Sequence, residues 1–300
     1  MGFNLEAPVN TDTTPAILRR WAQTPIFLAK VPVWESTTQL GERTLSKMAD
    51  LDRRYAQGTT VGRTDAGVVD QGLRAYMLRV YNYMASGVAI TGVVAYLVYA
   101  MSVVSGADGA IASLTPFGNF IFNTPFKWVV IFAPLAMVFF VSARINSMSV
   151  GAAQLAFWAF AGLMGLSLSS IFMVYAHASI AQVFFISAAS FGALSLWGYT
   201  TSRDISGWGS FLFMGLIGII IAMLVNLFVG SSALQFAISV IGVLVFAGLT
   251  AYDTQQIKEM YSVNDDGSVS GRKAVMGALR LYLDFINLFM MLLSLFGDRR

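Results

Sequence analysis

The feature that most constrains this chain is a series of seven apolar segments, each near the roughly 20 residues that a membrane-spanning helix needs. They occupy about residues 80–104, 126–143, 150–175, 179–200, 208–229, 233–257 and 274–297. Only 12% of the residues are charged, about half the share in a soluble domain. The sequence therefore predicts an all-α polytopic membrane protein, a bundle of seven transmembrane helices.

Residues 1–77 have a different composition from the rest of the chain. They are rich in Thr, Gln, Asp, Arg and Gly, and their apolar residues are scattered. A segment of this kind buries too little apolar surface to order itself. We therefore expect a polar, poorly ordered cytoplasmic arm over 1–77, which helps to fix topology, and a seven-helix transmembrane domain over 78–300.

Basic residues give the orientation of the bundle. Loops on the side of the N-terminal arm contain Arg144, Arg203 and Lys258, whereas the opposite loops carry almost no basic residue. Cytoplasmic loops are the ones enriched in Lys and Arg, so the N-terminus is predicted to be cytoplasmic. Seven spans place Asp298–Arg300 on the far side, against this rule. A six-span arrangement with a re-entrant last segment is therefore the alternative.

Residue types that are missing exclude several functions. The chain has no cysteine, and its only histidine is His177. Disulfides, thiolate catalysis, zinc–sulfur sites and sites built on two histidines are thus excluded. The net charge of +3 mostly reports membrane orientation, and it does not indicate a nucleic-acid partner.

Two of the apolar segments each contain one carboxylate. Asp253 lies in TAYDTQQIK (250–258), and Asp284 lies in LYLDFINL (281–288). A charge near the centre of a bilayer costs at least ~2.5 kcal/mol, so such residues usually mark ion or proton paths. The alternative is that each acid caps a helix end, or is neutralised by one neighbour for packing.

Helical spacing gives each acid a polar stripe. The last segment has Arg280, Asp284, Asn287, Met291 and Ser294 on one face, and the preceding segment has Ser239, Gly242, Thr250, Asp253 and Thr254. If the last helix begins near residue 274, Asp284 lies deeper than Asp253 by roughly 8 Å. Tilt, or an earlier start of the last helix, would bring the two acids level.

A close pair of carboxyls has a defined chemistry. Both cannot ionise cheaply, so Asp253 and Asp284 would share a proton and respond to pH as a unit. The ionised pair would attract a cation. Calcium prefers several hard oxygen ligands, which the pair, Asn287, the carbonyls near Thr250–Asp253 and water could supply transiently. Tyr252 is a supporting polar residue of this stretch. No other cofactor is expected.

Three basic residues are candidates to pair with these acids. Arg280 precedes Asp284 by one helical turn, and Arg144 ends the second apolar segment at a depth suited to Asp253. Lys258 is expected to act only as a topology anchor. For Arg144, an interfacial arginine that snorkels towards the headgroups is an equal alternative.

Three segments of the chain are distinctive: GYTTSRDISGWGSFLFM (198–214), GVLVFAGLTAYDTQQIK (242–258) and GALRLYLDFINLFMMLLSLFG (277–297). They resemble the Bax inhibitor family, also called the transmembrane Bax-inhibitor-motif or YccA-like family, and the resemblance covers about 74–300. It implies a seven-helix bundle with a cytoplasmic N-terminus, whose last helix is surrounded by the other six. We further expect a bacterial inner-membrane protein that is a monomer or weak oligomer.

The resemblance also implies a pH-sensitive calcium leak, governed by an aspartate pair and an arginine latch. By position the pair falls on Asp253 and Asp284, and the latch falls on Arg144. Some relatives carry a glutamate within the second helix, but the stretch around Ala133–Pro134 has none. Bacterial relatives are linked to regulating a membrane protease, and animal relatives to suppressing cell death.

The sequence is compatible with three functions. The leading one is a passive, proton-gated calcium leak in the lipid bilayer, although a cation/proton exchanger would use the same acids. The second is a regulatory protein that binds a membrane protease or a cell-death factor through residues 1–77. An intramembrane aspartyl protease is disfavoured, because it needs Gly-x-Gly-Asp where this chain has Leu281-Tyr282-Leu283-Asp284, and we expect no enzyme.

Overall fold

A computed structural model of the chain describes residues 71–106 and 111–299. The predicted N-terminal arm, 1–77, lies outside the described residues except for its last seven, which are helical. The first described helix, Gln71–Ser102, therefore begins before the domain boundary expected at residue 78.

The described residues contain seven helices that are long and apolar enough to cross a membrane, and each corresponds to one predicted segment. After Gln71–Ser102 they are α4 (Phe126–Arg144, continued by the 3-10 turn η3, Ile145–Ser147), α5 (Val150–Leu168, followed by α6, Ile171–Val174), α7 (His177–Thr200), α8 (Trp208–Val229), α9 (Ser232–Glu259) and α10 (Gly267–Phe296). Because α10 is one continuous helix of 30 residues, the re-entrant alternative for the last segment is wrong.

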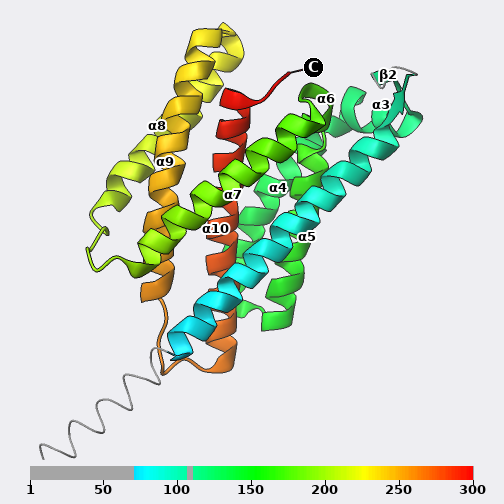
Figure 1. Cartoon of the computed structure of the whole chain (residues 1–300). Coiled ribbons are helices and arrows are strands. Elements are labelled where there is room, and N and C mark those ends of the chain that lie inside the picture. Colours follow the sequence, from blue (N-terminus) through cyan, green and yellow to red (C-terminus); the bar gives the residue numbers. More distant parts are fainter. Residues whose placement is uncertain (1–70, 107–110, 300) are drawn as a thin grey trace, which may run out of the picture. The chain divides into compact units, whose positions relative to one another are not determined.

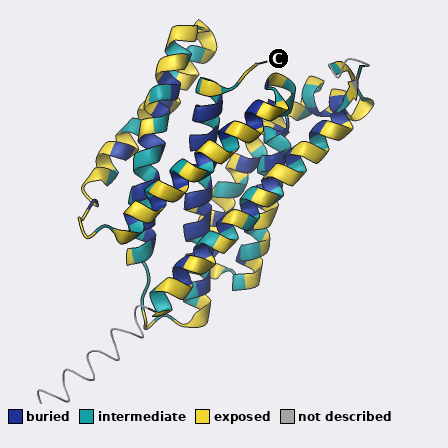
Figure 2. Ribbon diagram, in the orientation of Figure 1, coloured by how far each residue is buried: buried dark blue, intermediate teal, exposed yellow. Residues whose placement is uncertain are grey.

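The last helix lies at the centre of the bundle, as predicted (Figure 1). In the most apolar part of α10, 61% of the residues are buried, against 17–33% in the other six spans. It packs on α9, α7 and α5, and Figure 2 shows buried positions along most of its length. The outer helices instead expose large apolar side chains, such as Phe228 of α8, on surfaces suited to lipid.

Local sequence explains where the last two long helices begin. Gly230 has φ +66°, a left-handed conformation that ends α8, and Ser231 caps α9 by accepting a hydrogen bond from the Leu234 amide at 3.3 Å. Asp266 caps α10 in the same way, accepting from the Val269 amide at 2.7 Å. This cap starts α10 seven residues before the predicted position 274.

A small hairpin and a short helix were not predicted. Strands β1 (Val103–Ser105) and β2 (Ile111–Leu114) pair antiparallel and lead into α3 (Pro116–Asn123). Thr115 caps α3, and Pro116 occupies its first turn, a position where proline is favoured. The sequence interpretation assigned Val103 and Val104 to the end of a transmembrane segment, because an apolar β-branched run fits both structures.

The C-terminal residues dock on the start of α7. The Ala176 amide donates to the Asp298 carbonyl oxygen at 2.9 Å, and the Asp298 amide donates to Ser179 Oγ at 2.9 Å. The end of the chain is therefore held against the bundle at the end of α10 opposite to Asp266.

Candidate functional site

The two intramembrane acids meet at the interface of α9 and α10. The side chains of Asp253 and Asp284 lie close enough to interact with each other. Asp284 is buried, with 5% of its surface exposed, and Asp253 is half-buried. The structure thus brings together the pair on which the sequence interpretation depends.

One antiparallel register of α9 on α10 accounts for this meeting. Close contacts along the interface join Ile257 to Gly277, Gly242 to Met291 and Ser239 to Ser294. Asp253 and Asp284 fall between the first two of these contacts. The depth difference of roughly 8 Å between Asp253 and Asp284 was expected if α10 started near residue 274. Because α10 starts earlier, at Gly267, this difference does not arise.

One oxygen of Asp284 has no partner in the structure. Its Oδ2 atom is buried and accepts no hydrogen bond, a state shared within the described residues only by the hydroxyl of Tyr76. Buried polar atoms are nearly always hydrogen-bonded. An unpaired carboxyl oxygen inside a membrane bundle is suited to take up a proton or to contact a passing cation.

Arg280 is the basic residue that acts on the pair. It lies one turn before Asp284 on α10, and its charge interacts with both Asp253 and Asp284. Its side chain is exposed and forms no ion pair within 4.0 Å with either acid. The positive charge of Arg280 therefore acts on both carboxyl groups through space, and Arg280 forms no direct ion pair with either of them.

The predicted latch, Arg144, lies at the C-terminal end of α4 and is exposed. The charged groups that act on Asp253 in this structure are Arg280 and Asp284. A pairing between Arg144 and the acids stays a prediction. Lys258 donates to the Tyr199 carbonyl oxygen at 3.0 Å and thus ties the end of α9 to α7.

The other predicted polar residues lie near the acids without bonding to them. Thr250 donates to the Phe246 carbonyl oxygen at 2.8 Å, and Asn287 donates to that of Leu283, also at 2.8 Å. Both side chains are therefore satisfied within their own helices. Tyr252 leans away towards α8, where its ring packs on Gly209.

A chain of hydroxyl groups beside Asp253 was not predicted. Tyr81 Oη lies 2.7 Å from Ser195 Oγ, which lies 2.9 Å from Thr254 Oγ1. Thr254 in turn donates to the Thr250 carbonyl oxygen at 2.7 Å. These bonds join the Gln71–Ser102 helix and α7 to the acid-bearing part of α9. In the sequence, Tyr81 and Ser195 were marked only by being polar residues within apolar segments.

A second polar cluster joins α9 and α10 at the far end of their interface. Ser294 Oγ accepts hydrogen bonds from Ser239 Oγ at 3.0 Å and from Gln235 Nε2 at 3.1 Å. Asn226 of α8 donates to Gln235 Oε1 at 3.1 Å. Asn226, Gln235 and Ser294 border a cavity of about 390 Å³. The predicted stripes that contain Ser239 and Ser294 do face each other, whereas nothing in the residue spacing indicated that Gln235 joins them.

Within residues 71–106 and 111–299, no three His, Cys, Asp or Glu side chains gather closely enough to hold a metal ion. Asp253 and Asp284 supply carboxylate oxygens from two residues, whereas a calcium ion takes six to eight oxygen ligands. The pair is therefore suited to brief contact with a hydrated cation rather than to tight binding.

Comparison with known proteins places the chain in a family. The family described as inhibitor of apoptosis-promoting Bax1 matches residues 73–300. The inner membrane protein YbhL of Escherichia coli is 48% identical over 231 residues, which cover 76% of this chain and 94% of that protein. The protein RP147 of Rickettsia prowazekii is 47% identical over 231 residues, covering 77% of this chain and 92% of its own length. A protein of Caulobacter vibrioides is 41% identical over 254 residues, 84% of this chain and its own full length. The chain therefore belongs to the Bax inhibitor family of integral membrane proteins.

Proposed function

We propose that this protein is a pH-sensitive, passive cation leak, with calcium as the conducted ion and the Asp253–Asp284 pair as its switch. One observation carries the proposal: carboxyls from two neighbouring helices face each other inside the bundle, and Asp284 is 5% exposed. Acids in such positions usually belong to ion or proton pathways.

The proposed switch works through charge. When both acids are ionised, they attract cations and can hold a nearby arginine, Arg144 or Arg280. Uptake of one proton weakens the hold on the arginine and lets the helices separate at the cytoplasmic end. The same proton also weakens cation attraction, so the direction of the pH response reports which effect dominates.

We also propose the bacterial inner membrane as its location, with the N-terminus in the cytoplasm. The relative YbhL is named an inner membrane protein, and the basic loops of this chain lie on the side of residue 71. Proteolysis is disfavoured, because Leu281 and Tyr282, which precede Asp284, are bulky and fully buried and leave no room for a substrate strand.

Calcium flux into proteoliposomes, measured over a range of pH, tests the proposal. We expect the double variant Asp253→Asn with Asp284→Asn to lose the pH dependence of the flux. Asp204→Asn, which alters an exposed loop acid, is the matched control and should behave as wild type. Unchanged flux and pH dependence in the double variant would remove the pair from gating. Dependence of calcium movement on an opposing proton gradient would indicate an exchanger instead.

A second candidate function follows from the description of the family as an inhibitor of apoptosis-promoting Bax1. In this function the protein regulates a partner, such as a membrane protease or a cell-death factor, through its N-terminal residues. Deletion of residues 1–66 separates the two candidates. Loss of partner capture with intact flux would support regulation, and loss of neither would leave the leak as the better account.

A further inference from the structure

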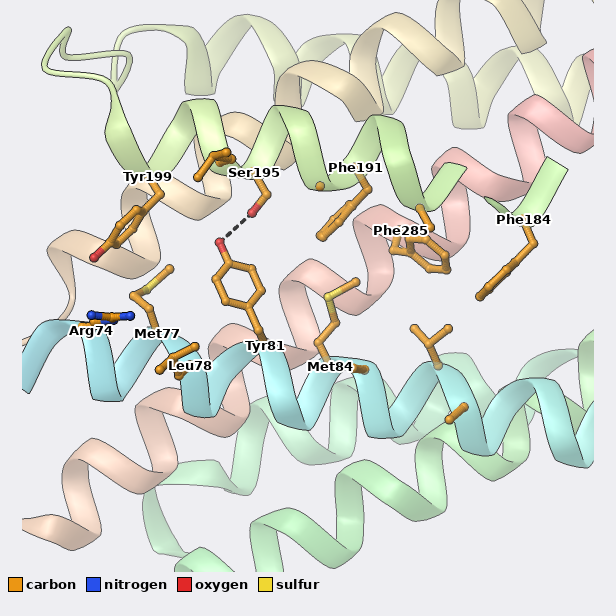
Figure 3. A pocket seen from close by; sticks show the side chains of 16 residues that line it. Arg74, Met77, Leu78, Tyr81, Met84, Phe184, Phe191, Ser195, Tyr199 and Phe285 are labelled. Carbon is orange, nitrogen blue, oxygen red and sulfur yellow. Dashed lines mark hydrogen bonds between the residues drawn. The ribbon is translucent and has the colours of Figure 1, made fainter. Parts of the chain in front are cut away.

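A groove separates the Gln71–Ser102 helix from α7. It encloses about 810 Å³, within the range of cavities that bind organic ligands, roughly 300–1,000 Å³. Figure 3 shows side chains from both helices pointing into it, with Phe285 of α10 among them. Almost all of its lining is apolar, apart from Arg74, Tyr81, Ser195 and Tyr199.

The groove opens sideways, away from the bundle axis. Met84, Phe191 and Phe285 in its lining are buried, whereas Leu78 and Leu196 on its two rims are more than half exposed. Small side chains leave the space between the two helices unfilled, and a Cβ atom added at Gly192 would meet nothing within 4 Å. Since both walls are predicted transmembrane segments, the surroundings of this opening are lipid.

The apolar track is longer than this one cavity. A second cavity of about 300 Å³ shares Val88, Phe184 and Phe285 with the first and continues towards Phe172 and Ile171. Together the two follow the Gln71–Ser102 helix across much of its span. A narrow apolar track of this kind suits an extended hydrocarbon chain better than a compact ligand.

Positive charge gathers at one end of the groove. Figure 3 shows Arg74 and Tyr199 together at the end opposite to Phe184. Lys258 lies over the Tyr199 ring, with Nζ 5.8 Å from the ring centroid, so two cations lie at this end. Among the described residues Arg74 forms no ion pair. The end of the groove that holds Arg74 lies on the side of the bundle predicted to be cytoplasmic. Guanidinium groups bind phosphate oxygens strongly.

We propose that this groove binds an anionic phospholipid, with one acyl chain in the apolar track and its phosphate held by Arg74 and Lys258. The site is separate from the acid pair and does not depend on ion conduction. The hydroxyl chain from Tyr81 through Ser195 to Thr254 connects the wall of the groove to α9.

Native mass spectrometry of the purified full chain, delipidated and then given phosphatidylglycerol or phosphatidylcholine, tests the proposal. Wild type should retain phosphatidylglycerol in preference to phosphatidylcholine. Gly192→Phe should fill the groove and remove specific retention of either lipid, and the smaller Gly192→Leu should weaken it. Gly218→Phe on α8, where an added Cβ also meets nothing within 4 Å, is the matched control and should bind as wild type.

Charge is tested by a second matched pair. Arg74→Gln should weaken phosphatidylglycerol retention about fivefold, the effect of one basic residue close to a membrane surface, with phosphatidylcholine unaffected. Arg79→Gln removes an exposed arginine of the same helix that does not line the groove and should change nothing. Equal retention by Gly192→Phe and Gly218→Phe, or by Arg74→Gln and Arg79→Gln, would overturn the proposal. Because no ion flux is measured, failure of the proposed leak would leave this result untouched.

Discussion

The interface between α9 and α10 is polar at both ends, and the two ends differ in chemistry. At one end Asp253 faces Asp284, and one buried oxygen of Asp284 lacks a hydrogen bond. At the other end Ser239, Gln235 and Ser294 are neutral and bonded to one another at 3.0–3.1 Å. Some 15 Å of helix separates Asp284 from Ser294.

The difference shows how the contact between two helices can be independent of pH at one end and dependent on pH at the other. Neutral hydrogen bonds between helices hold the same geometry at any ordinary pH. A pair of carboxyls changes its net charge when it gains or loses a proton. Between the two polar ends, the apolar side chain of Met291 packs on Gly242. We therefore expect variants at the acid end to alter pH response, and variants at the serine end to alter stability alone.

The largest expected effect concerns how tightly the acid end is held. A Cβ atom at Gly198 would lie 2.4 Å from the carbonyl oxygen of Ala251, two residues before Asp253. Gly198→Ala should therefore destabilise the protein by about 1–3 kcal/mol through overpacking, measured by thermal unfolding in detergent. Gly192→Ala on the same helix meets nothing within 4 Å and should be neutral or slightly stabilising. Equal stability of the two variants would mean that α7 does not hold the acid end.

The serine end should give a smaller effect, confined to stability. Ser294→Ala removes the acceptor for Ser239 and Gln235, and should cost about 0.5–1.5 kcal/mol, as interhelical hydrogen bonds in membranes do. Ser142→Ala, at an exposed position of α4, is the control for the same unfolding assay. A changed pH dependence of calcium flux in Ser294→Ala would break the division between the two ends.

Arg280 allows the acid end to be adjusted without removing an acid. Arg280→Gln takes away a positive charge that acts on both carboxyls, which favours their protonated form. The pH midpoint of calcium flux should therefore move up, by only a fraction of what a buried arginine would cause, since the Arg280 side chain is exposed and partly screened. Arg272→Gln, two turns earlier on α10, should leave the midpoint in place, and a shift of equal size there would argue against a local effect.

Asp266, the acid that caps the start of α10, provides the contrast of a carboxyl in water. The Val269 amide and the Ser268 hydroxyl donate to Asp266 and lower its pKa below the ordinary value of 3.8. Its stabilising effect is therefore complete above pH 3.8 and is lost as the pH falls through the lowered pKa. Asp266→Ala should lower the Tm slightly at pH 7, and Asp266→Asn should preserve it, because asparagine also caps helices. An equal loss in both variants would contradict the capping role.

Much of this architecture follows from the sequence. Seven runs of apolar residues predicted the seven spans, and helical spacing predicted that Ser239 shares a helix face with Asp253 and Ser294 shares one with Asp284. The sequence could not show that Asp266 starts α10 seven residues early, because capping depends on the backbone conformation of one turn. Nor could it show the bond from Tyr81 to Ser195, whose partners lie 114 residues apart. Which arginine lies nearest the acids likewise depends on helix rotation, which spacing alone does not fix.

The central claim is that Asp253 and Asp284 act as one unit, and a double-mutant cycle on calcium flux tests it most directly. The pH dependence of flux into proteoliposomes would be compared among wild type, Asp253→Asn, Asp284→Asn and the double variant. If the acids share a proton, each single variant should remove most of the pH dependence, and the second substitution should add little. Independent effects that combine additively on the free-energy scale, or singles that both keep the wild-type response, would contradict the account.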